Sequence, residues 1–261
     1  MIDEKLQAQL RAKYNPDGSL LRQHQLRMVE MLKYFDELCQ KHEIRYWLSS
    51  GNCLGLARHG GFIPWDDDLD VEMLREDYLK LEKVFEETDD YIFQTWKNDK
   101  KYFWAFGKMR DKHSYINEGK LYDELYEYRG VYIDVFCLEK SNGLVHRICA
   151  SILMRTFYKY QDKSYFQLVK RIGFKFVSLC RFLSRIVPNN KLRHTYGCIW
   201  HSNLRDLKDI FPLKRAKFEG VELNVPNNMD GYLKKIYGDY MLVPSEEKRR
   251  KPHVIKLNLS L

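Results

Sequence analysis

The stretch that decides how the chain folds is Phe62-Ile63-Pro64-Trp65-Asp66-Asp67-Asp68-Leu69-Asp70. The two glycines before it and its proline oppose regular structure, whereas the apolar and acidic alternation from Asp68 to Met73 predicts a strand. In a strand, Asp68 and Asp70 point to the same face, with Cα atoms about 6.5 Å apart. Carboxylates at this density repel one another unless a cation compensates, and their oxygens suit Mg²⁺ or Mn²⁺ better than zinc. We expect Asp68 and Asp70 to be metal ligands, with Asp66 and Asp67 as loop residues beside them.

A third carboxylate lies further along the chain, in Gly130-Val131-Tyr132-Ile133-Asp134-Val135-Phe136. This run is otherwise apolar and predicts a strand, where an unpaired buried charge is costly. We therefore expect Asp134 to stand beside Asp68 and Asp70 as the third metal ligand. The alternative interpretation is an aspartate that caps the strand or lies at its edge.

The chain upstream of the acidic stretch predicts a phosphate site. Residues 44–49 are β-prone, and a glycine turn separates them from a predicted helix at 52–59. The backbone N–H groups and side chains of Ser50, Gly51 and Asn52 are placed to hold a phosphate at the start of that helix. A strand, a glycine turn, an acid pair on the next strand and a third acid later is the layout of the nucleotidyltransferase fold.

The whole chain predicts an α+β fold, with a nucleotidyltransferase-like mixed β-sheet core that is flanked by helices. This prediction rests on helical spacing of apolar residues in some segments and on β-prone runs in others. The predicted helices cover 19–42, 52–59, 75–87, 144–187 and 229–237. The predicted strands cover 44–49, 68–73, 91–96, 102–109 and 131–137, with a hairpin at 215–225.

The length of 261 residues allows one sizeable core, and 44% apolar with 14% aromatic residues exclude a disordered chain. We expect four regions in this chain. They are an N-terminal extension at 1–20, a catalytic core at 21–140, a basic helical insertion at 141–195 and the C-terminal part of the catalytic domain at 196–261.

The sequence predicts a cytoplasmic protein with reduced thiols. Its start lacks the basic and apolar pattern of a signal peptide, and no apolar run is long enough to span a bilayer. Its six cysteines include no Cys-x-x-Cys pair, which argues against a zinc knuckle and against a disulfide framework.

The net charge of +8 belongs to one segment. Between Ser141 and Thr195, eleven Lys or Arg residues face one acid, whereas the rest of the chain carries 33 basic and 35 acidic residues. No nucleic-acid partner is expected from such a distribution. Nine of these basic residues lie within 144–187, where they alternate with Phe157, Phe166, Phe174, Phe176, Leu179 and Phe182; they are Arg147, Arg155, Lys159, Lys163, Lys170, Arg171, Lys175, Arg181 and Arg185. This pattern over 144–187 is typical of a helix that lies on an anionic membrane, and the alternative is a solvated basic face over an ordinary core.

Several motifs together resemble the LicD family, and the string from Ile63 to Asp70 is the most specific of them. The others are Ile44-Arg45-Tyr46-Trp47-Leu48, Gly51-Asn52-Cys53-Leu54-Gly55, Arg58-His59, Arg75-Glu76-Asp77-Tyr78, Lys108-Met109-Arg110-Asp111, Ile133-Asp134-Val135-Phe136, Phe218-Glu219-Gly220, Val225-Pro226, and Tyr237-Gly238-Asp239-Tyr240 with Pro244. The resemblance spans roughly Leu26 to His253.

This resemblance implies a reaction. The LicD family includes bacterial phosphocholine transferases that decorate teichoic acids or lipopolysaccharide from CDP-choline, and it is related to the fukutin-type ribitol-phosphate transferases. The chain is therefore expected to move a phosphorylated alcohol, phosphocholine first, from a CDP-linked donor to a teichoic acid, lipopolysaccharide, capsule or lipid-linked glycan, with release of CMP. Asp68, Asp70 and Asp134 would hold Mg²⁺ or Mn²⁺ against the donor pyrophosphate, and Asp134 is a candidate base for the acceptor hydroxyl. A lipid-linked acceptor would place the enzyme at the inner face of the membrane.

Arg58, Lys108 and Arg110 are candidates to bind the phosphates, because guanidinium and ammonium groups pair with phosphate oxygens. The alternative for each of them is an exposed charge that pairs with the aspartates.

Two histidines and one tryptophan in the motifs also have two interpretations. His59 and His253 are candidate acid–base groups, or structural or solvent-exposed histidines. Trp65 either stacks on the nucleotide base or packs in the core.

Two other functions compete with this transferase. A metal-dependent glycosyltransferase would also carry an Asp-x-Asp pair and would use a nucleotide sugar. A non-enzymatic adaptor would use only the basic segment to bind a membrane surface.

Overall fold

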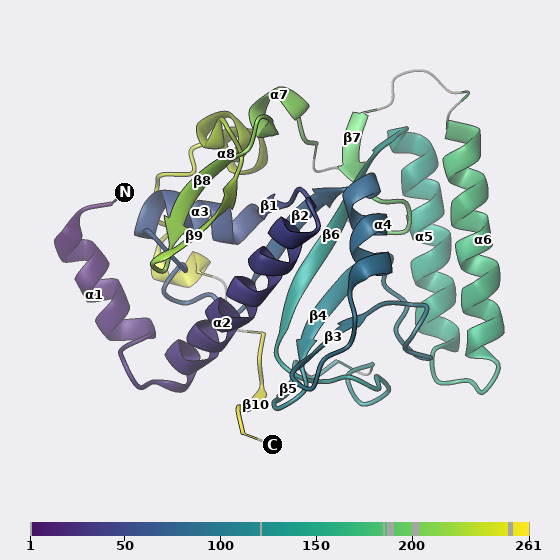
Figure 1. The fold of residues 1–261 in the computed structure, drawn as a ribbon, viewed down its shortest axis with the longest axis horizontal. Coiled ribbons are helices and arrows are strands. Elements are labelled where there is room, and N and C mark those ends of the chain that lie inside the picture. Colours follow the sequence, from purple (N-terminus) through teal and green to yellow (C-terminus); the bar gives the residue numbers. More distant parts are fainter. Residues whose placement is uncertain are drawn as a thin grey trace.

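The computed structural model describes residues 2–120, 122–184, 186, 191–199, 204–249 and 253–260. Within these residues, six strands form a central mixed sheet (Figure 1). They are β1 (Trp47–Leu48), β2 (Asp70–Leu74), β3 (Tyr91–Gln94), β4 (Gly107–Asp111), β6 (Tyr132–Ser141) and β7 (Lys191–His194). Two small two-stranded sheets pair β5 (Tyr115–Asn117) with β10 (Lys256–Asn258) and β8 (Lys214–Phe218) with β9 (Val221–Val225).

The central sheet has the order β1-β2-β6-β4-β3, and β7 pairs with the C-terminal half of β6. β2 and β6 are parallel, whereas the other neighbouring strands are antiparallel. The predicted mixed sheet flanked by helices is therefore confirmed.

The helices surround this sheet (Figure 1). They are α1 (Glu4–Tyr14), α2 (Leu20–Lys41), α3 (Ser50–His59), α4 (Arg75–Val84), α5 (Gly143–Tyr160), α6 (Phe166–Ser184), α7 (Leu207–Ile210), α8 (Met229–Tyr237) and the 3₁₀ turn η1 (Glu246–Lys248). None of the helices in the described part of the chain combines the length and apolar character needed to cross a membrane.

The two faces of the sheet have different roles. Ile133, Val135 and Cys137 of β6 pack with the apolar side of α2 in one buried core. The alternate residues of β6, Tyr132, Asp134 and Phe136, line a cavity on the opposite face. Because side chains alternate along a strand, one face of β6 packs in the core and the other face lines the cavity.

The basic helical insertion at 141–195, called the basic segment below, begins and ends on the central sheet. It leaves from the end of β6, forms the α5–α6 hairpin and returns through β7, which pairs with β6 from Leu138 to Ser141. Figure 1 shows α5 and α6 side by side at one edge of the molecule. The hairpin packs against the aromatic segment at 102–106, so its inner face belongs to a second core.

Several predicted elements differ from the structure in their bounds, and two of the differences change how a segment folds. The predicted helix at 144–187 divides after Tyr160, and its last part, including Arg185 and Val187, lies outside the described residues. The predicted strand at 102–109 begins only at Gly107, because Asp99 accepts the N–H of Tyr102 at 3.1 Å and the Tyr102 hydroxyl donates to the Phe106 carbonyl. Local hydrogen bonds thus hold this aromatic run as a loop.

A buried ion pair lies in the face of β2 that points away from α2. Glu72 is fully buried, and its carboxylate pairs with the guanidinium of Arg205 at Nε–Oε distances of 3.0 and 3.1 Å. The Trp47 indole donates to it at 3.1 Å and the Tyr232 hydroxyl at 3.0 Å, while His194 lies 3.3 Å away. Burial opposes the charge of Glu72, but Arg205 and His194 hold the pKa of that carboxyl far below its usual range. This cluster connects β1, β2, β7 and α8 through side-chain contacts with Glu72.

Candidate active site

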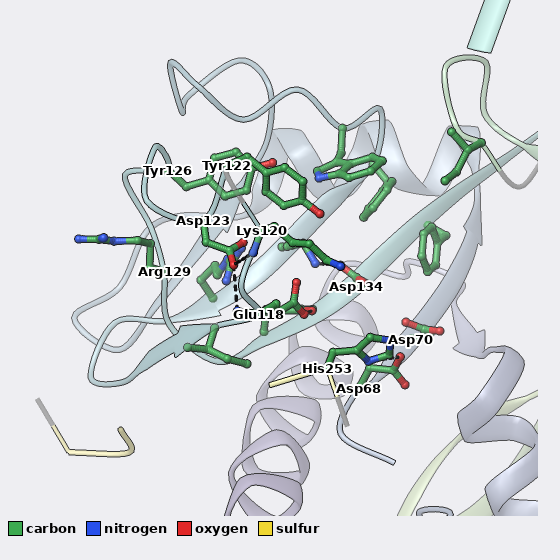
Figure 2. Close-up of a pocket in the computed structure, with 18 of the residues that line it drawn as sticks. Asp68, Asp70, Glu118, Lys120, Tyr122, Asp123, Tyr126, Arg129, Asp134 and His253 are labelled. Atoms are coloured by element: carbon green, nitrogen blue, oxygen red, sulfur yellow. Dashed lines mark hydrogen bonds and ion pairs between the residues drawn. The ribbon is translucent and has the colours of Figure 1, made fainter. Parts of the chain in front are cut away.

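A cavity of about 750 Å³ opens on the face of the sheet opposite α2. It holds three carboxylates that the sequence singles out, Asp68, Asp70 and Asp134, together with Ser50 and two basic residues, Lys108 and Arg110. Figure 2 shows Asp68, Asp70 and His253 at one side of the cavity, Tyr122, Tyr126 and Asp123 at the other, and Asp134, Lys120 and Glu118 between them.

The centre of the site is a row of residues on three neighbouring strands. Asp70 of β2 is the register partner of Asp134 of β6, and Asp134 is the register partner of Lys108 of β4. The Lys108 ammonium group lies 2.6 Å from Asp134 Oδ1 and 3.3 Å from the centre of the Tyr132 ring. Asp134 is thus neither an edge residue nor a cap, since it lies inside β6, which pairs with β2 on one side and β4 on the other.

Burial and crowding oppose ionisation in this row. Burial, and then the negative charges of Asp68, Asp134 and Asp66, raise the pKa of Asp70 well above its usual value, and Lys108 only partly offsets them. Burial also raises the pKa of Asp134 although Lys108 pairs with it. A site that concentrates negative charge in this way favours a cationic ligand.

The backbone of the acidic stretch is held by Asn52. Its side-chain amide donates to the Asp68 carbonyl at 3.1 Å, and its oxygen accepts the N–H of Asp70 at 2.6 Å. Asp68 precedes β2, which begins at Asp70, so the predicted strand is shorter at this end. Asn52 was predicted to hold a phosphate, and the structure places it outside the cavity lining, where it positions the two aspartates instead.

Asp67 connects the acidic stretch to the C-terminal segment. Its carboxylate accepts the N–H of Val254 at 2.8 Å and lies 3.1 Å from His253 Nδ1. Burial works against the charge of Asp67, but these hydrogen bonds hold the pKa of that carboxyl below its usual value. His253 also lies 3.9 Å from Asp68 Oδ2 and lines the cavity, so it is the predicted histidine that the fold brings to the site.

The start of α3 is only partly open to the cavity. Ser50 lines it, and its N–H donates to the Tyr232 hydroxyl at 3.3 Å. Gly51 lies against Asp66, where an added Cβ would stand 3.1 Å from Asp66 Oδ2. Of the predicted phosphate turn, Ser50 is the residue that reaches the cavity.

The two predicted arginines have different surroundings. Arg110 lines the cavity, donates to Gln94 and to the Gly130 carbonyl at 2.8 Å each, and lies 4.6 Å from the Tyr132 ring centre. Arg58 donates to the carbonyls of Tyr240 and Leu242 and does not line the cavity. Arg58 therefore connects α3 to the C-terminal segment, and the structure does not bring it to the site.

His59 and Trp65 also lie away from the cavity, in the contact with α1. Burial lowers the pKa of His59 to about 4, which leaves this imidazole neutral near pH 7. Trp65 is buried, with its ring centre 5.4 Å from that of Tyr14 and 4.8 Å from the Arg249 guanidinium. The packing interpretation fits both residues.

The donor chemistry of Asp68, Asp70 and Asp134 fits a divalent cation that prefers carboxylate oxygens. The raised pKa values of Asp70 and Asp134 show how strongly this row disfavours its own negative charge. Among the residues that the structure describes, no three acidic, imidazole or thiol groups already stand together as a metal-binding cluster. Lys108 is the cation paired with Asp134 here.

Sequence reasoning missed the aromatic half of the cavity. Its lining residues come from the loop before β4, from the segment at 118–129, from β6 and from α5. A signal existed in β6, where Tyr132 and Phe136 flank Asp134 at the period of two that places all three on one face. The other aromatic residues are far apart in the sequence, so no local pattern joins them.

Comparison with known proteins gives one family for this chain. The model for the LicD/FKTN/FKRP nucleotidyltransferase domain matches residues 43–180, which is just over half of the sequence. The chain is 26% identical to the lipopolysaccharide cholinephosphotransferase LicD of Haemophilus influenzae, over 90% of this chain and 96% of that protein. It is 40% identical to the human ribitol 5-phosphate transferase FKRP, but over only 21% of this chain and 11% of that protein.

Proposed function

Since the chain belongs to the LicD family of nucleotidyltransferase-domain enzymes, we propose that it transfers phosphocholine from CDP-choline to a cell-surface glycan, with release of CMP. The enzyme class is that of the phosphotransferases to which its relatives belong. The main support for CDP-choline as the donor is the similarity to a cholinephosphotransferase, which extends over 90% of the chain. The row of Asp70, Asp134 and Lys108 in the cavity supports the proposed chemistry.

We also propose that Asp68, Asp70 and Asp134 hold Mg²⁺ or Mn²⁺. When bound, this ion neutralises the charge of the donor phosphates and of the leaving CMP. Asp68 and Asp70 are placed by Asn52 on one side of the cavity, and Lys108 brings a fixed positive charge from the other side. These residues orient the phosphate of the donor toward the acceptor.

The proposed transfer is a single displacement. The acceptor hydroxyl oxygen forms a bond to the phosphorus that carries choline, and the bond from that phosphorus to the bridging oxygen breaks, which releases CMP. The hydroxyl proton passes to Asp134. Asp134 is the candidate base because its carboxylate lines the cavity at the centre of the row, between Asp70 and Lys108.

A donor screen tests this function. Purified protein is incubated with Mg²⁺, lipopolysaccharide that lacks phosphocholine, and CDP-choline, CDP-ribitol or UDP-glucose in turn, and the released nucleotide is measured. We expect nucleotide release to be fastest with CDP-choline, as CMP. Turnover of UDP-glucose alone would favour the glycosyltransferase, and no turnover with any donor would favour the adaptor.

We further propose that the α5–α6 hairpin lies on an anionic membrane, which would place the enzyme at the inner face of the membrane beside lipid-linked acceptors. Large apolar side chains are exposed along both helices, at Leu144, Ile148, Ile152, Leu168, Ile172, Leu179, Phe182 and Leu183. Exposed basic residues alternate with them, at Arg147, Arg155, Lys159, Arg171 and Lys175. Exposed apolar and basic residues together are typical of a helix that binds the surface of a bilayer.

Several residues of the sequence pattern do not belong to the proposed membrane surface, because their side chains are buried or paired. Lys170 is buried and donates to three backbone carbonyls at 2.6–3.0 Å, and burial lowers its pKa to about 8. Arg181 is paired with Glu139. Phe157, Phe166 and Phe174 are buried in the second core, so the sequence pattern counted them on the wrong face.

Replacing Ile148 and Ile172 together by aspartate is expected to weaken binding to phosphatidylglycerol vesicles by at least about tenfold. The change removes two exposed apolar side chains that would enter the bilayer surface and adds two negative charges. Wild-type binding should also fall as salt rises. Vesicle sedimentation measures both effects, and Leu20→Asp, an exposed leucine of α2, serves as the control. Equal binding of the double variant and the wild type would refute the membrane surface.

A further inference from the structure

The cavity has an aromatic half that the proposed transfer step does not use. We call it the aromatic chamber, and its walls are Trp104, Phe106, Tyr122, Phe136 and Tyr158. Figure 2 shows Tyr122 across the cavity from Asp68 and Asp70, with Asp134 between them. A group bound in the chamber would therefore extend away from the phosphate that reacts beside the aspartates.

The chamber walls form one continuous aromatic surface. The Trp104 ring centre lies 5.6 Å from that of Phe106 and 6.0 Å from that of Tyr122, whose plane is nearly perpendicular to it. The rings of Phe106 and Phe136 are 4.6 Å apart, and those of Tyr122 and Tyr158 are 6.1 Å apart. Trp104 and Phe106 are buried and pack in the second core, which fixes the positions of these two walls.

Negative charge lies at the same end of the cavity. Glu118 and Asp123 both line it, and Glu118 accepts the hydroxyl proton of Tyr132 in a hydrogen bond. Asp123 accepts the N–H groups of Glu118 and Lys120 at 2.9 Å each, which fixes the loop that carries them. Two cations, Lys120 and Arg129, also line the cavity; Arg129 is paired with Glu124, and Lys120 is exposed.

The protein already places cations of its own on the neighbouring aromatic ring. The Lys108 ammonium group lies 3.3 Å and the Arg110 guanidinium 4.6 Å from the centre of Tyr132. The faces of aromatic rings attract cations through their quadrupole, and this attraction is strongest where water is excluded. The same physics is available to a ligand in the chamber.

We propose that the aromatic chamber binds the quaternary ammonium group of the donor, an inference that rests on the proposed function and names the part of the site that selects choline. A trimethylammonium group donates no hydrogen bond, so it is recognised by aromatic faces and by nearby carboxylates. A polyol such as ribitol would leave hydroxyl groups unpaired against these walls, at a cost in binding. The chamber would thus bind a choline donor in preference to a ribitol donor.

Equilibrium binding of two phosphate esters tests this proposal without any turnover. Phosphocholine and 3,3-dimethylbutyl phosphate have the same shape, but the second has a neutral carbon in place of the nitrogen. We expect phosphocholine to bind roughly tenfold more tightly by calorimetry, because only its cation gains from the aromatic faces and from Glu118. Equal affinities, or no binding of either ester, would overturn the proposal.

Two substitutions of Tyr122 make a matched pair for this test. Tyr122→Phe keeps the ring and should keep the preference for phosphocholine, whereas Tyr122→Leu keeps an apolar side chain without a ring and should lose most of it. Glu118→Gln keeps an acceptor for Tyr132 and should reduce the preference through the lost charge.

CMP binding separates this proposal from base stacking and from failure of the proposed function. If the chamber stacks on the nucleotide base instead, Tyr122→Leu will weaken CMP binding, and that result would also overturn the proposal. If the proposed function is wrong but the chamber is correctly assigned, no CDP-linked donor will release CMP while the preference for phosphocholine persists.

Discussion

Replacing Asp70 by asparagine is expected to lower kcat for CMP release by about 10³-fold, because the proposed cation loses a charged ligand at the centre of the site. The same substitution should leave the metal-free protein as stable as the wild type or raise its Tm. Burial and three neighbouring carboxylates raise the pKa of Asp70, so its ionised form is unfavourable in the folded chain, and a neutral amide relieves that repulsion.

Steady-state rates and thermal unfolding measure these two effects on the same samples. Asp230→Asn, which changes an exposed aspartate of α8, is the control and should alter neither quantity. A variant at Asp70 that keeps more than about a tenth of wild-type kcat, well outside the expected loss, would rule this residue out as a ligand.

Replacing Arg205 by methionine is expected to destabilise the protein by about 3–5 kcal/mol, because the fully buried carboxylate of Glu72 would lose the cation that compensates for it. Trp47 and Tyr232 would still donate hydrogen bonds to Glu72 and His194 would remain 3.3 Å away, but the permanently charged guanidinium would be lost. Urea denaturation of the two proteins measures the change in the free energy of unfolding.

Two further variants show whether the loss comes from an uncompensated charge. Adding Glu72→Gln to Arg205→Met removes the unpaired carboxylate and should restore part of the stability. Lys234→Met breaks an exposed ion pair with Asp230 and should cause no measurable loss. An Arg205→Met protein as stable as the wild type would contradict this description of the cluster.

The carboxylate row was predictable because each part of it has a local signal. The alternation around Asp68 and Asp70 predicts a strand, and a charge in the apolar run of Asp134 demands a partner. The pairing of Asp70 with Asp134 was expected in outline, and the structure shows it as direct neighbours on parallel strands. The family resemblance read from these motifs is likewise confirmed by the match over residues 43–180.

The roles of individual polar residues were not predictable, because they depend on partners distant in the chain. Asn52 holds the backbone of a stretch 16 residues away, and Arg58 binds carbonyls more than 180 residues away. Both lie in motifs that suggest phosphate binding, and only the three-dimensional structure shows that their side chains are engaged elsewhere. Sequence spacing does not contain that information.

The basic segment shows the same limit. Its periodicity correctly predicts helices, but it does not say which residues face the second core. Lys170 is buried because its ammonium group donates hydrogen bonds to three backbone carbonyls within 99–102, a loop about 70 residues earlier in the chain. The aromatic chamber arises in the same way, because Trp104, Tyr122 and Tyr158 meet only when the α5–α6 hairpin packs on the sheet.

We propose that a divalent cation held by Asp68, Asp70 and Asp134 drives phosphocholine transfer. The most direct test is the rate of CMP release from CDP-choline by wild-type protein that is first stripped with a chelator and then titrated with Mg²⁺ or Mn²⁺. We expect no CMP release above background without metal, and a saturable return of activity with either ion. Full activity in the presence of excess chelator would contradict it.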